Sequence, residues 1–517
     1  MCTAVENSVY EDGFSACEIP VSVNRARSIL SLGVSDMLVL ERGTQAVIRV
    51  FDTDGDDVPD TKQIIATAPS LNHGLAIHDG YIYASRDTEV YRWSFSDDDF
   101  SSIGYQETVV TNMNADGNGG APQGHRTRTL IFDAQGRLYI SVGSNGNVDR
   151  DSHRSRIRRF ELNEANFPLD FQLGEVFADG LRNEVGLAFD RFGVLWGVEN
   201  GADNLRREDL GGDITDDNPA EEVNRFKEED AGKHWGYPYC WTEYGLDESV
   251  GLGRGTVWAW PSFLDAGAIT DEECRANYVP PLVSMQAHSA PLGIAFYEFR
   301  DATDRPSDCK DVPAFPKEMD GYAFIAFHGS WNRDIPTGYK VIYIPIENGE
   351  VTGEPTDLLA HKPPNAKWED GFRPVDVDFD SCGRLLVTSD GSGGRGAKLV
   401  RIEYSNAFPS PSVSPSFSPL ESVTEIPTVT ASRGPSFAPQ VLLSEAPSEG
   451  TSTTEVPSSA PQGTLSDSPT VSASNQQSQS SIVDSSSRNV GSSHRNRSSF
   501  NGRIKSSPVL DIHCTCD

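Results

Sequence analysis

The sequence predicts an all-β fold, a six-bladed β-propeller followed by a disordered tail rich in Ser, Thr and Pro. Three observations support this fold class. A strand-turn-strand pattern recurs six times before residue 405. No segment of that region shows a sustained period of 3.6 residues with capping residues at its ends. After Tyr404 the composition changes abruptly to Ser, Thr and Pro.

The repeated unit is clearest in LIFDAQGRLYISVGSNG, residues 130–146. An apolar strand is followed by a turn of Asp and Gly, a second apolar strand, a loop, and a third strand that ends on Arg or Tyr. The six copies begin at Leu38, Leu75, Leu130, Leu187, Asp320 and Val375. A small antiparallel sheet cannot bury both of its faces alone, so units of this kind pack radially around an axis.

We expect three parts in the chain: an N-terminal extension over residues 1–29, the propeller over residues 30–405, and the tail over residues 406–517. The tail buries too little apolar surface to offset its ordering entropy, so it is expected to be disordered or O-glycosylated. Within the propeller, one or two helical turns are expected near residues 219–231, with Asn218 as the cap and Pro219 at the first helical position.

The charge of the chain excludes some classes of function. The formal net charge of the 517 residues is -33, whereas a nucleic-acid surface needs a basic stripe. No apolar run approaches the ~20 residues that cross a bilayer, so no membrane span is expected. The first residues, MCTAVENSVYEDGF, lack the charged start and apolar core of a signal peptide.

The cysteines are spread too thinly for a zinc finger or a disulfide-dense small fold. Cys240 and Cys274 flank an insert rich in Gly and Trp and are candidates for a disulfide, although the sequence alone leaves their pairing open. Such a bridge would indicate an oxidising compartment. We therefore expect an extracellular or secretory location, despite the missing signal peptide.

An acidic segment, FDTDGDDVPD at residues 51–60, is a candidate cation loop. Asp52, Asp54, Asp56 and Asp60 surround Gly55, which permits a sharp turn that points several oxygens inward. The bidentate Glu of an EF-hand is not met, because Gln63 occupies that place. Two interpretations stay open here, a structural calcium ion and a solvated acidic turn.

The strongest functional signal is a set of polar residues just before the strands. His125 precedes the strand at Leu130, and Arg182 and Asn183 precede the next repeat in DGLRNEVGLAFD. Equivalent strand entries of successive blades converge on the propeller axis, so these residues should face one cavity. The alternative for Arg182 is a surface salt bridge.

Further polar and aromatic residues fall at equivalent places. They are His73 in LNHGLAIHDG, His288 in AHSAPLGIAFY, His328, Trp331 and Arg333 in AFHGSWNRD, and Arg373 in GFRPVDVDFD. Imidazole and guanidinium groups gathered around an axis would suit an anionic, flat, aromatic ligand.

Several motifs together resemble a known family. GHRTRTLIFDAQGRLYISVGSNG, GLRNEVGLAFD, GVENGADN, HWGYPYCW, AHSAPLGIAFY and GFRPVDVDFD, in this order and spacing, are similar to the soluble quinoprotein glucose/sorbosone dehydrogenases. The likeness is greatest to the fungal-type pyranose dehydrogenases that use pyrroloquinoline quinone (PQQ). It covers roughly residues 30–405 and leaves out the tail.

The resemblance implies catalytic roles. It makes His125 the general base that takes a proton from the anomeric hydroxyl of the sugar, a task that suits an imidazole near neutral pH. It makes Arg182 and Asn183 the pair that hydrogen-bonds the quinone oxygen and stabilises developing negative charge.

The resemblance also implies binding roles. The carbonyls of Gly201 and Ala202 would hold the calcium ion that binds PQQ, and Glu222 and Trp235 would belong to a second, structural calcium site. The remaining cofactor contacts would come from Arg42, His73, His288, His328 and Arg373. Among these, His328 replaces a lysine of the bacterial glucose enzymes, which favours the fungal-type branch.

The leading hypothesis is a PQQ- and calcium-dependent dehydrogenase that oxidises an aldose or ketoaldose to a lactone or acid. Its electrons would pass to an external acceptor such as a cytochrome. Two alternatives remain: a calcium-dependent lactonase or esterase, which needs several carboxylates converging on the axis, and a catalytically silent propeller that serves as a binding module.

Overall fold

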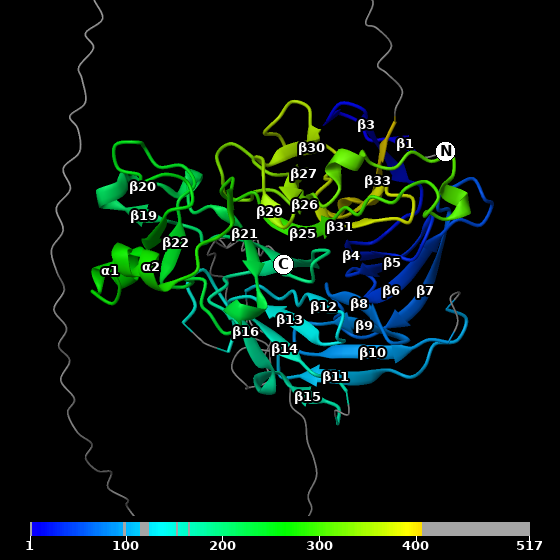
Figure 1. Cartoon of the computed structure of the whole chain (residues 1–517), viewed down its shortest axis with the longest axis horizontal. Helices are drawn as coiled ribbons and strands as arrows, with labels where there is room; N and C mark the ends of the chain where they lie inside the picture. Colours follow the sequence, from blue (N-terminus) through cyan, green and yellow to red (C-terminus); the bar gives the residue numbers. More distant parts are fainter. Residues whose placement is uncertain (1–2, 97–99, 114–123, 151–152, 164–165, 406–517) are drawn as a thin grey trace, which may run out of the picture. The chain divides into compact units, whose positions relative to one another are not determined.

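The structure, a computed structural model, describes residues 3–405 apart from 97–99, 114–123, 151–152 and 164–165. Six sheets of four or five strands follow one another around a common centre, which confirms the predicted six-bladed β-propeller. In Figure 1 they run in chain order from blue through cyan and green to yellow. The predicted tail, residues 406–517, lies outside the described residues.

The first three blades are formed as follows. Blade 1 consists of β4 (Ala26–Ser31), β5 (Asp36–Glu41), β6 (Ala46–Phe51) and β7 (Thr61–Thr67). Blade 2 consists of β8 (Leu75–His78), β9 (Tyr81–Ser85), β10 (Val90–Ser94), β11 (Glu107–Thr111) and β15 (Leu169–Asp170). Blade 3 consists of β12 (Leu130–Phe132), β13 (Leu138–Val142), β14 (Arg156–Phe160) and β16 (Glu175–Asp179).

The other three blades complete the ring. Blade 4 consists of β17 (Glu184–Phe189), β18 (Leu195–Glu199), β21 (Glu221–Phe226) and β24 (Val283–Met285). Blade 5 consists of β25 (Pro291–Phe296), β26 (Ala323–Phe327), β27 (Lys340–Ile344), β30 (Thr356–His361) and β2 (Ser8–Tyr10). Blade 6 consists of β31 (Pro374–Phe379), β32 (Leu385–Ser392), β33 (Arg395–Tyr404), β3 (Phe14–Ile19) and β1 (Thr3–Ala4).

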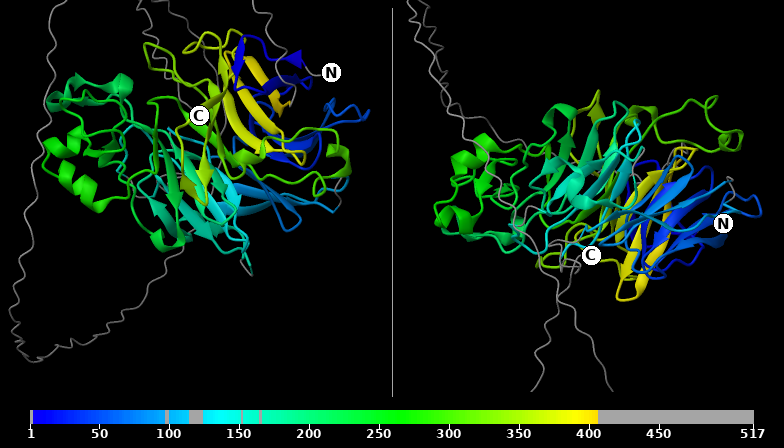
Figure 2. Two further views of the ribbon diagram at one scale, coloured as in Figure 1. Left: turned by 45° about the horizontal axis from the view of Figure 1, so that its top comes forward. Right: turned by 90° about the horizontal axis from the view of Figure 1, so that it is seen from below.

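The N-terminal segment takes part in the ring. Strand β3 pairs antiparallel with β33, from Phe14 opposite Tyr404 to Ile19 opposite Leu399. Residues 14–19, which the sequence analysis assigns to an extension, thus supply the fourth strand of blade 6. Figure 2 shows the blue N-terminal strands beside the yellow strands of that blade.

Apolar side chains fill the space between neighbouring blades. One buried cluster lies at each junction, because both faces of every sheet carry apolar residues. At the junction that closes the ring, Leu386 and Leu399 of blade 6 pack with Val39 and Ile48 of blade 1. The ring is therefore held together by packing at its closing junction as well as by the β3–β33 pairing.

The innermost strand of every blade lines a cavity of about 380 Å³ at the hub. Two half-buried carboxylates of β31 line this cavity and bridge to β4. Asp376 accepts the N–H of Ile29 at 3.1 Å, and Asp378 accepts the N–H of Ser31 at 2.7 Å. Burial raises the pKa of Asp376 to about 7 and that of Asp378 to about 6.

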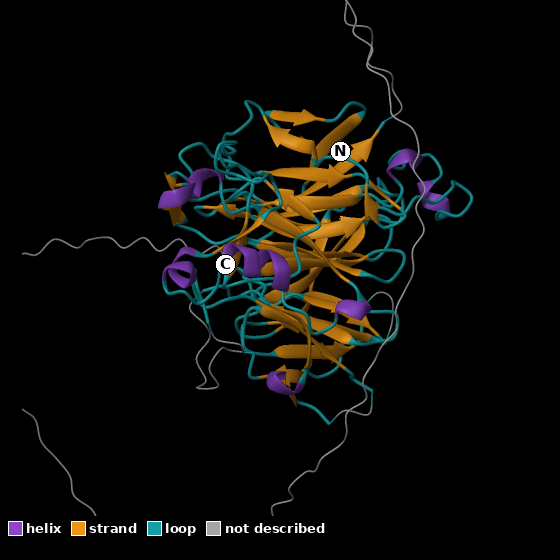
Figure 3. Ribbon diagram, turned by 60° about the vertical axis from the view of Figure 1, so that its left-hand side comes forward, coloured by secondary structure: helices purple, strands orange, loops and turns teal. Residues whose placement is uncertain are grey.

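Long insertions interrupt blade 4 between β18 and β24. They contain β19 (Arg206–Arg207), β20 (Gly212–Asp213), β22 (Cys240–Thr242), β23 (Val257–Ala259), α1 (Pro261–Asp265) and α2 (Asp271–Asn277). A disulfide joins Cys240 to Cys274 and confirms the candidate pair; a second joins Cys309 to Cys382. Blade 5 also carries a hairpin of β28 (Ile346–Glu347) and β29 (Glu350–Val351). Figure 3 shows the short helices outside the sheets.

The one or two helical turns expected near residues 219–231 are found only in part. Residues 221–226 form β21, which pairs with β18 on one side and β24 on the other, so sheet pairing overrides the local helix signal. A single 3-10 turn, η4 (Glu228–Asp230), follows. Asn218 does not start a helix but follows one, as the C-cap of the 3-10 turn η3 (Thr215–Asp217). Its side chain accepts the N–H of Tyr244 at 2.9 Å and donates to the carbonyl of Gly245 at 3.0 Å.

No helix in the described part of the chain is long and apolar enough to span a membrane.

Candidate active site

A pocket of about 150 Å³ opens on the face of the propeller where the innermost strands begin. Several of its lining residues precede innermost strands, including His125 before β12, Arg182 before β17 and His288 before β25. Others follow the second strands of the same blades, including Asn147, Asp203 and Trp331. Blades 3, 4 and 5 thus supply one concave site from equivalent loops.

The structure brings His125 together with Arg182 and Asn183, as their strand-entry positions predict. The backbone of Ser144 connects them, since its carbonyl accepts the N–H of His125 at 3.1 Å and its N–H donates to the carbonyl of Arg182 at 2.8 Å. Gly143 lies between His125 and Asn183, where there is no space for a side chain. A Cβ at Gly143 would stand 2.7 Å from Cβ of His125 and 2.6 Å from Oδ1 of Asn183.

The hydrogen bonds of His125 assign its tautomer. Nδ1 lies 3.2 Å from the carbonyl oxygen and 3.0 Å from the hydroxyl oxygen of Ser144. The carbonyl can only accept, and the hydroxyl donates its own proton to the carbonyl of Gly146 at 2.7 Å. Nδ1 therefore carries the proton, which leaves the lone pair on Nε2.

The imidazole of His125 is neutral over the physiological range. Burial, and then the positive charge of Arg182, lower its pKa to about 3. A neutral ring with its lone pair on Nε2 can accept a proton from a bound hydroxyl group.

Arg182 is a buried cation and not a surface salt-bridge partner. It contacts Asp203 Oδ2 at 2.9 Å, Asn147 Oδ1 at 3.2 Å and the carbonyl of Asn200 at 3.2 Å. Its Nε is buried and has no hydrogen-bond partner among the described residues. Asn183 is also buried, and its amide donates to Asn200 Oδ1 at 3.2 Å.

Asp203 and Glu221 are the acidic residues that line this pocket, and neither was predicted from the sequence. Besides Arg182, Asp203 accepts a hydrogen bond from Asn332 Nδ2 at 2.8 Å and lies 3.5 Å from His288 Nδ1. Burial acts to raise its pKa, but the charges of Arg182 and His288 outweigh that effect and lower the pKa to about 2. The acid- and Asn-rich loop after β18 was the sequence signal for it.

His288 is held in a constrained backbone. Its φ is +59°, and Ala290 has φ +55°, a conformation that residues other than glycine rarely adopt. Nε2 of His288 lies 2.6 Å from the carbonyl of Thr215 in the 3-10 turn η3 (Thr215–Asp217). Burial acts to lower the pKa of His288, but the hydrogen bond and negative charge of the neighbouring Asp203 carboxylate act to raise it. The net effect is a raised pKa.

The other predicted cofactor contacts form a second group beside this pocket. His328 Nε2 lies 2.8 Å from Asp390, and Arg373 donates to the carbonyl of His328 at 3.0 Å. His73 Nδ1 accepts a hydrogen bond from Arg27 Nε at 3.3 Å.

Arg27 and Asp390 connect this second group and were not predicted from the sequence. Arg27 NH1 lies 2.8 Å from Asp390 Oδ2, so the pair joins His73 to His328. Burial, Arg27 and Arg42 lower the pKa of His73, which places Arg42, just after β5, near it. The N–H of His328 donates to the carbonyl of Ala290 at 2.8 Å and ties this group to the pocket.

The predicted metal ligands gather around a smaller pocket of about 30 Å³. Gly201, Ala202, Glu222 and Trp235 all line it, and Arg182 and Gly201 line both pockets. Its volume is of the size that one water molecule or ion fills. Glu199, which the sequence analysis did not select, also lines it.

The carboxylates of Glu199 and Glu222 line this smaller pocket, and Glu184 lies opposite Glu199 in the sheet. Burial raises the pKa of Glu222 to about 7 and the pKa values of Glu184 and Glu199 well above their ordinary value. Asn224 donates to both Glu184 and Glu199 at 3.2 Å. Oε1 of Glu184 is buried and lacks a hydrogen-bond partner within the described ranges. A cation here would relieve the repulsion between these carboxylates.

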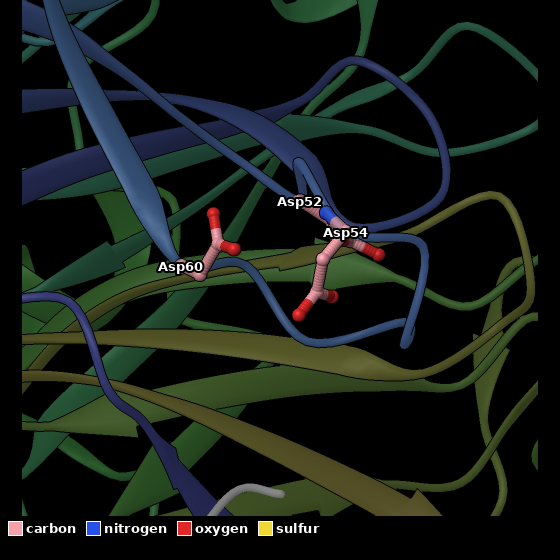
Figure 4. A group of neighbouring side chains, drawn as sticks. All are labelled: Asp52, Asp54 and Asp60. Atoms are coloured by element: carbon pink, nitrogen blue, oxygen red, sulfur yellow. Dashed lines mark hydrogen bonds between the residues drawn. The ribbon is translucent and has the colours of Figure 1, made fainter.

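The acidic loop of blade 1 lies apart from both pockets. Asp52, Asp54 and Asp60 bring ligand oxygens within 4.8 Å of one another in the loop between β6 and β7 (Figure 4). Local groups already use several of these oxygens: Asp52 accepts the N–H groups of Asp54 and Gly55, and Thr53 donates to Asp60. Both the calcium loop and the solvated turn therefore stay open.

Comparisons with known proteins agree with this architecture. A sequence profile described as TrAA12-like matches residues 8–394. A PQQ-dependent sugar dehydrogenase of Hypocrea jecorina is 30% identical over 409 residues, which cover 74% of this chain and 87% of the relative. A PQQ-dependent pyranose dehydrogenase of Coprinopsis cinerea is 29% identical over 416 residues. This match covers 74% of the chain but 53% of that relative, so the chain spans about half of its length.

Two solved structures are similar in fold and sequence. The calcium structure of the Trichoderma reesei protein of carbohydrate-active enzyme family AA12 has a TM-score of 0.65 and 29% identity, over 78% of this chain and 99% of that chain. The holo form of the PQQ domain of pyranose dehydrogenase from Coprinopsis cinerea has a TM-score of 0.64 and 26% identity, over 77% and 97%. These matches confirm the resemblance drawn from the sequence motifs, and the chain belongs to the TrAA12-like family.

Proposed function

We propose that this protein is a PQQ- and calcium-dependent sugar dehydrogenase that oxidises an aldose or ketoaldose of the pyranose or sorbosone type to its lactone or acid. The observation that carries the proposal is the shared pocket of His125 and Arg182, a neutral imidazole beside a buried guanidinium. The names of the two fungal relatives support both the cofactor and the substrate class.

The residues of this face fit PQQ, a flat quinone with three carboxylates. Polar atoms there are buried without a partner among the described residues, including Nε of Arg182, Nδ1 of His328 and Nε of Arg333. Buried polar atoms of this kind, the donors of the two arginines and the acceptor Nδ1 of His328, are costly unless a ligand or solvent satisfies them. Arg182, Asn183, His288 and the group of His73, His328, Arg373 and Arg42 would hold the cofactor, with guanidinium groups suited to its carboxylates.

The bound quinone would supply the two-electron acceptor for the hydride of the sugar. His125 would take the proton of the anomeric hydroxyl on Nε2, because Ser144 holds the other ring nitrogen as a donor. Arg182 would stabilise negative charge that develops on oxygen, since Asp203 and Asn147 fix its guanidinium in the pocket. Asp203 keeps the local charge balanced and so limits the cost of burying Arg182.

Calcium is the second proposed cofactor. The carbonyls of Gly201 and Ala202 would hold one ion near the quinone, and Glu222 and Trp235 would take part in a structural site. The carboxylate of Glu199 adds a hard oxygen ligand of the type that calcium prefers. The raised pKa values of these buried glutamates support a cation that would hold them in the charged form.

The calcium-dependent lactonase lacks support in the site. That chemistry needs several side-chain oxygens that converge on the axis, whereas the pocket there presents His125, Arg182 and His288. The silent binding module is equally disfavoured, since His125 and Arg182 are both present in the pocket. We also propose an external electron acceptor, such as a cytochrome. The disulfides Cys240–Cys274 and Cys309–Cys382 support an oxidising compartment.

The test is reconstitution of the purified full chain with PQQ and calcium. A quinone absorbance spectrum should develop on binding and bleach when an aldose or ketoaldose is added. His125→Ala should bind the quinone but lose turnover by a factor of 10² to 10⁴. Oxidation at the wild-type rate by His125→Ala would refute the base assignment, and hydrolysis of a lactone without PQQ would favour the lactonase.

A further inference from the structure

Trp331 differs from the other tryptophans of the chain. Its side chain is 47% exposed, whereas the remaining seven are at most 7% exposed. It lines the pocket that contains His125 and Arg182. Within the described ranges, its indole makes neither a ring contact nor a hydrogen bond. An aromatic face of this size, open to solvent at the edge of a polar pocket, is available to a ligand.

Two hydrogen bonds join the ends of the loop that carries Trp331. Ser330 and Thr337 bond reciprocally: the N–H of Ser330 donates to the carbonyl of Thr337 at 2.9 Å, and the N–H of Thr337 donates to the hydroxyl of Ser330 at 3.0 Å. Gly329 and Gly338, both with positive φ, pack at these ends, where a Cβ on Gly338 would stand 2.7 Å from Cα of Gly329. Residues 331–336 therefore form a compact tip between β26 and β27.

Two contacts fix that tip over the pocket. Asn332 donates to Asp203 at 2.8 Å, and Arg333 contacts Asp217 at 2.9 Å. Asp203 is the same carboxylate that orients Arg182. The position of Trp331 is thus coupled to the residues that would perform the chemistry, which is unusual for an incidental surface aromatic.

We propose that Trp331 is the platform on which the pyranose ring of the substrate stacks, and that it helps to decide which sugars the site accepts. The inference rests on the proposed function and adds the contact that binds the sugar ring. A pyranose ring presents a face of C–H groups whose positive ends suit the negative face of an indole ring, while its hydroxyl groups stay free for polar partners. Sugars with several axial hydroxyl groups on that face would stack less well.

The test separates sugar binding from quinone binding and from chemistry. Trp331→Ala and Trp331→Phe are compared with the wild-type holoenzyme and with Ile335→Ala. Ile335 is a matched control, because it is 62% exposed on the same tip but does not line the pocket. Three quantities are measured: the KM and kcat for an oxidised aldose, the Kd of PQQ, and calorimetric binding of 1,5-anhydroglucitol, which lacks the anomeric hydroxyl and is not oxidised there.

Trp331→Ala should raise KM and weaken 1,5-anhydroglucitol binding about tenfold, with kcat within about twofold and the Kd of PQQ unchanged. Trp331→Phe should recover most of the loss, and Ile335→Ala should match the wild type. Unchanged sugar binding in Trp331→Ala would overturn the proposal, as would a loss of PQQ affinity, which would make Trp331 a quinone contact. A wild-type protein that binds the sugar but oxidises none would contradict the proposed function alone.

Discussion

His125 and Ser144 form the pair that prepares the proposed base, with Nδ1 of His125 lying 3.0 Å from the hydroxyl oxygen of Ser144. Ser144→Ala should lower kcat about three- to tenfold, because one neutral hydrogen bond that orients the ring is lost while the backbone carbonyl still holds the tautomer. Ser144→Thr keeps the hydroxyl and serves as the control. Steady-state kinetics with saturating PQQ measure the effect, and equal rates in all three proteins would contradict it.

The acidic limit of activity should lie far below neutral pH. Burial and the Arg182 charge lower the pKa of His125 to about 3, so its imidazole remains neutral and able to accept a proton until the pH approaches that value. The kcat/KM of the wild type should therefore hold down to about pH 4 or 5.

Arg182→Gln tests the cause of that limit. Removal of the neighbouring positive charge should raise the pKa of His125 and move the acidic limb of the kcat/KM profile to higher pH, in addition to a lower maximum rate. The measurement is a pH–rate profile of both proteins. An acidic limb at the same pH in wild type and Arg182→Gln would exclude the proposed electrostatic effect.

Calcium should stabilise the folded protein through the smaller pocket. At a hundredfold excess over its Kd, one bound ion adds about 2.7 kcal/mol to the free energy of unfolding, and Glu222→Gln should remove most of that gain. Asp54→Asn, in the acidic loop of blade 1, is the matched control. Thermal unfolding with and without calcium measures both. If Asp54→Asn and not Glu222→Gln abolished the gain, the ion would belong to the outer loop.

The hub carboxylate Asp376 should make stability depend on pH. Its pKa is raised by burial from 3.8 to about 7 in the folded protein, so the folded state binds the proton more tightly than the unfolded state. The stabilisation is therefore complete below about pH 4 and is lost as the pH rises through about 7, a change on the order of 4 kcal/mol.

Asp376→Asn should flatten this part of the dependence, because an amide does not titrate and one oxygen still accepts a backbone N–H. Urea unfolding at pH 5 and pH 8 compares the two proteins. A wild type and an Asp376→Asn variant with the same slope between these values would show that Asp376 titrates at an ordinary pKa.

The sequence was sufficient to predict the ring and the centre of its pocket. Strand period, turn residues and recurrence predicted six blades, and equivalent strand entries predicted that His125 and Arg182 face one cavity. The repeats beginning at Leu38 and Asp320 were out of phase, because they start at β5 and β26, the second strands of blades 1 and 5. The innermost strand β4 was not recognised; it pairs with the adjacent β5, and its other neighbours, β31 and β8, belong to blades 6 and 2.

The residues that were missed act through tertiary contacts. Arg27 lies inside a strand and meets Asp390 across 363 positions of the sequence, so no local pattern indicated the pair. Asp203 lies in an acid-rich loop, and the sequence does not distinguish it from the neighbouring acidic residues. Only its contacts with Arg182 and Asn332 in the structure identify it. Glu184 and Glu199 were hidden for a related reason, because they fall where the chain enters and leaves ordinary strands.

The pairing of β3 with β33 has a consequence for how the protein is made. Phe14 leaves the ribosome early, but its partner Tyr404 is synthesised almost 400 residues later, at about 5–20 residues per second. For tens of seconds the first strands must wait without their sheet, with an unpaired edge exposed to other chains. Neighbouring nascent chains on one messenger RNA can therefore exchange these strands. A chaperone that covers the N-terminal strands during synthesis would raise the yield of closed propellers.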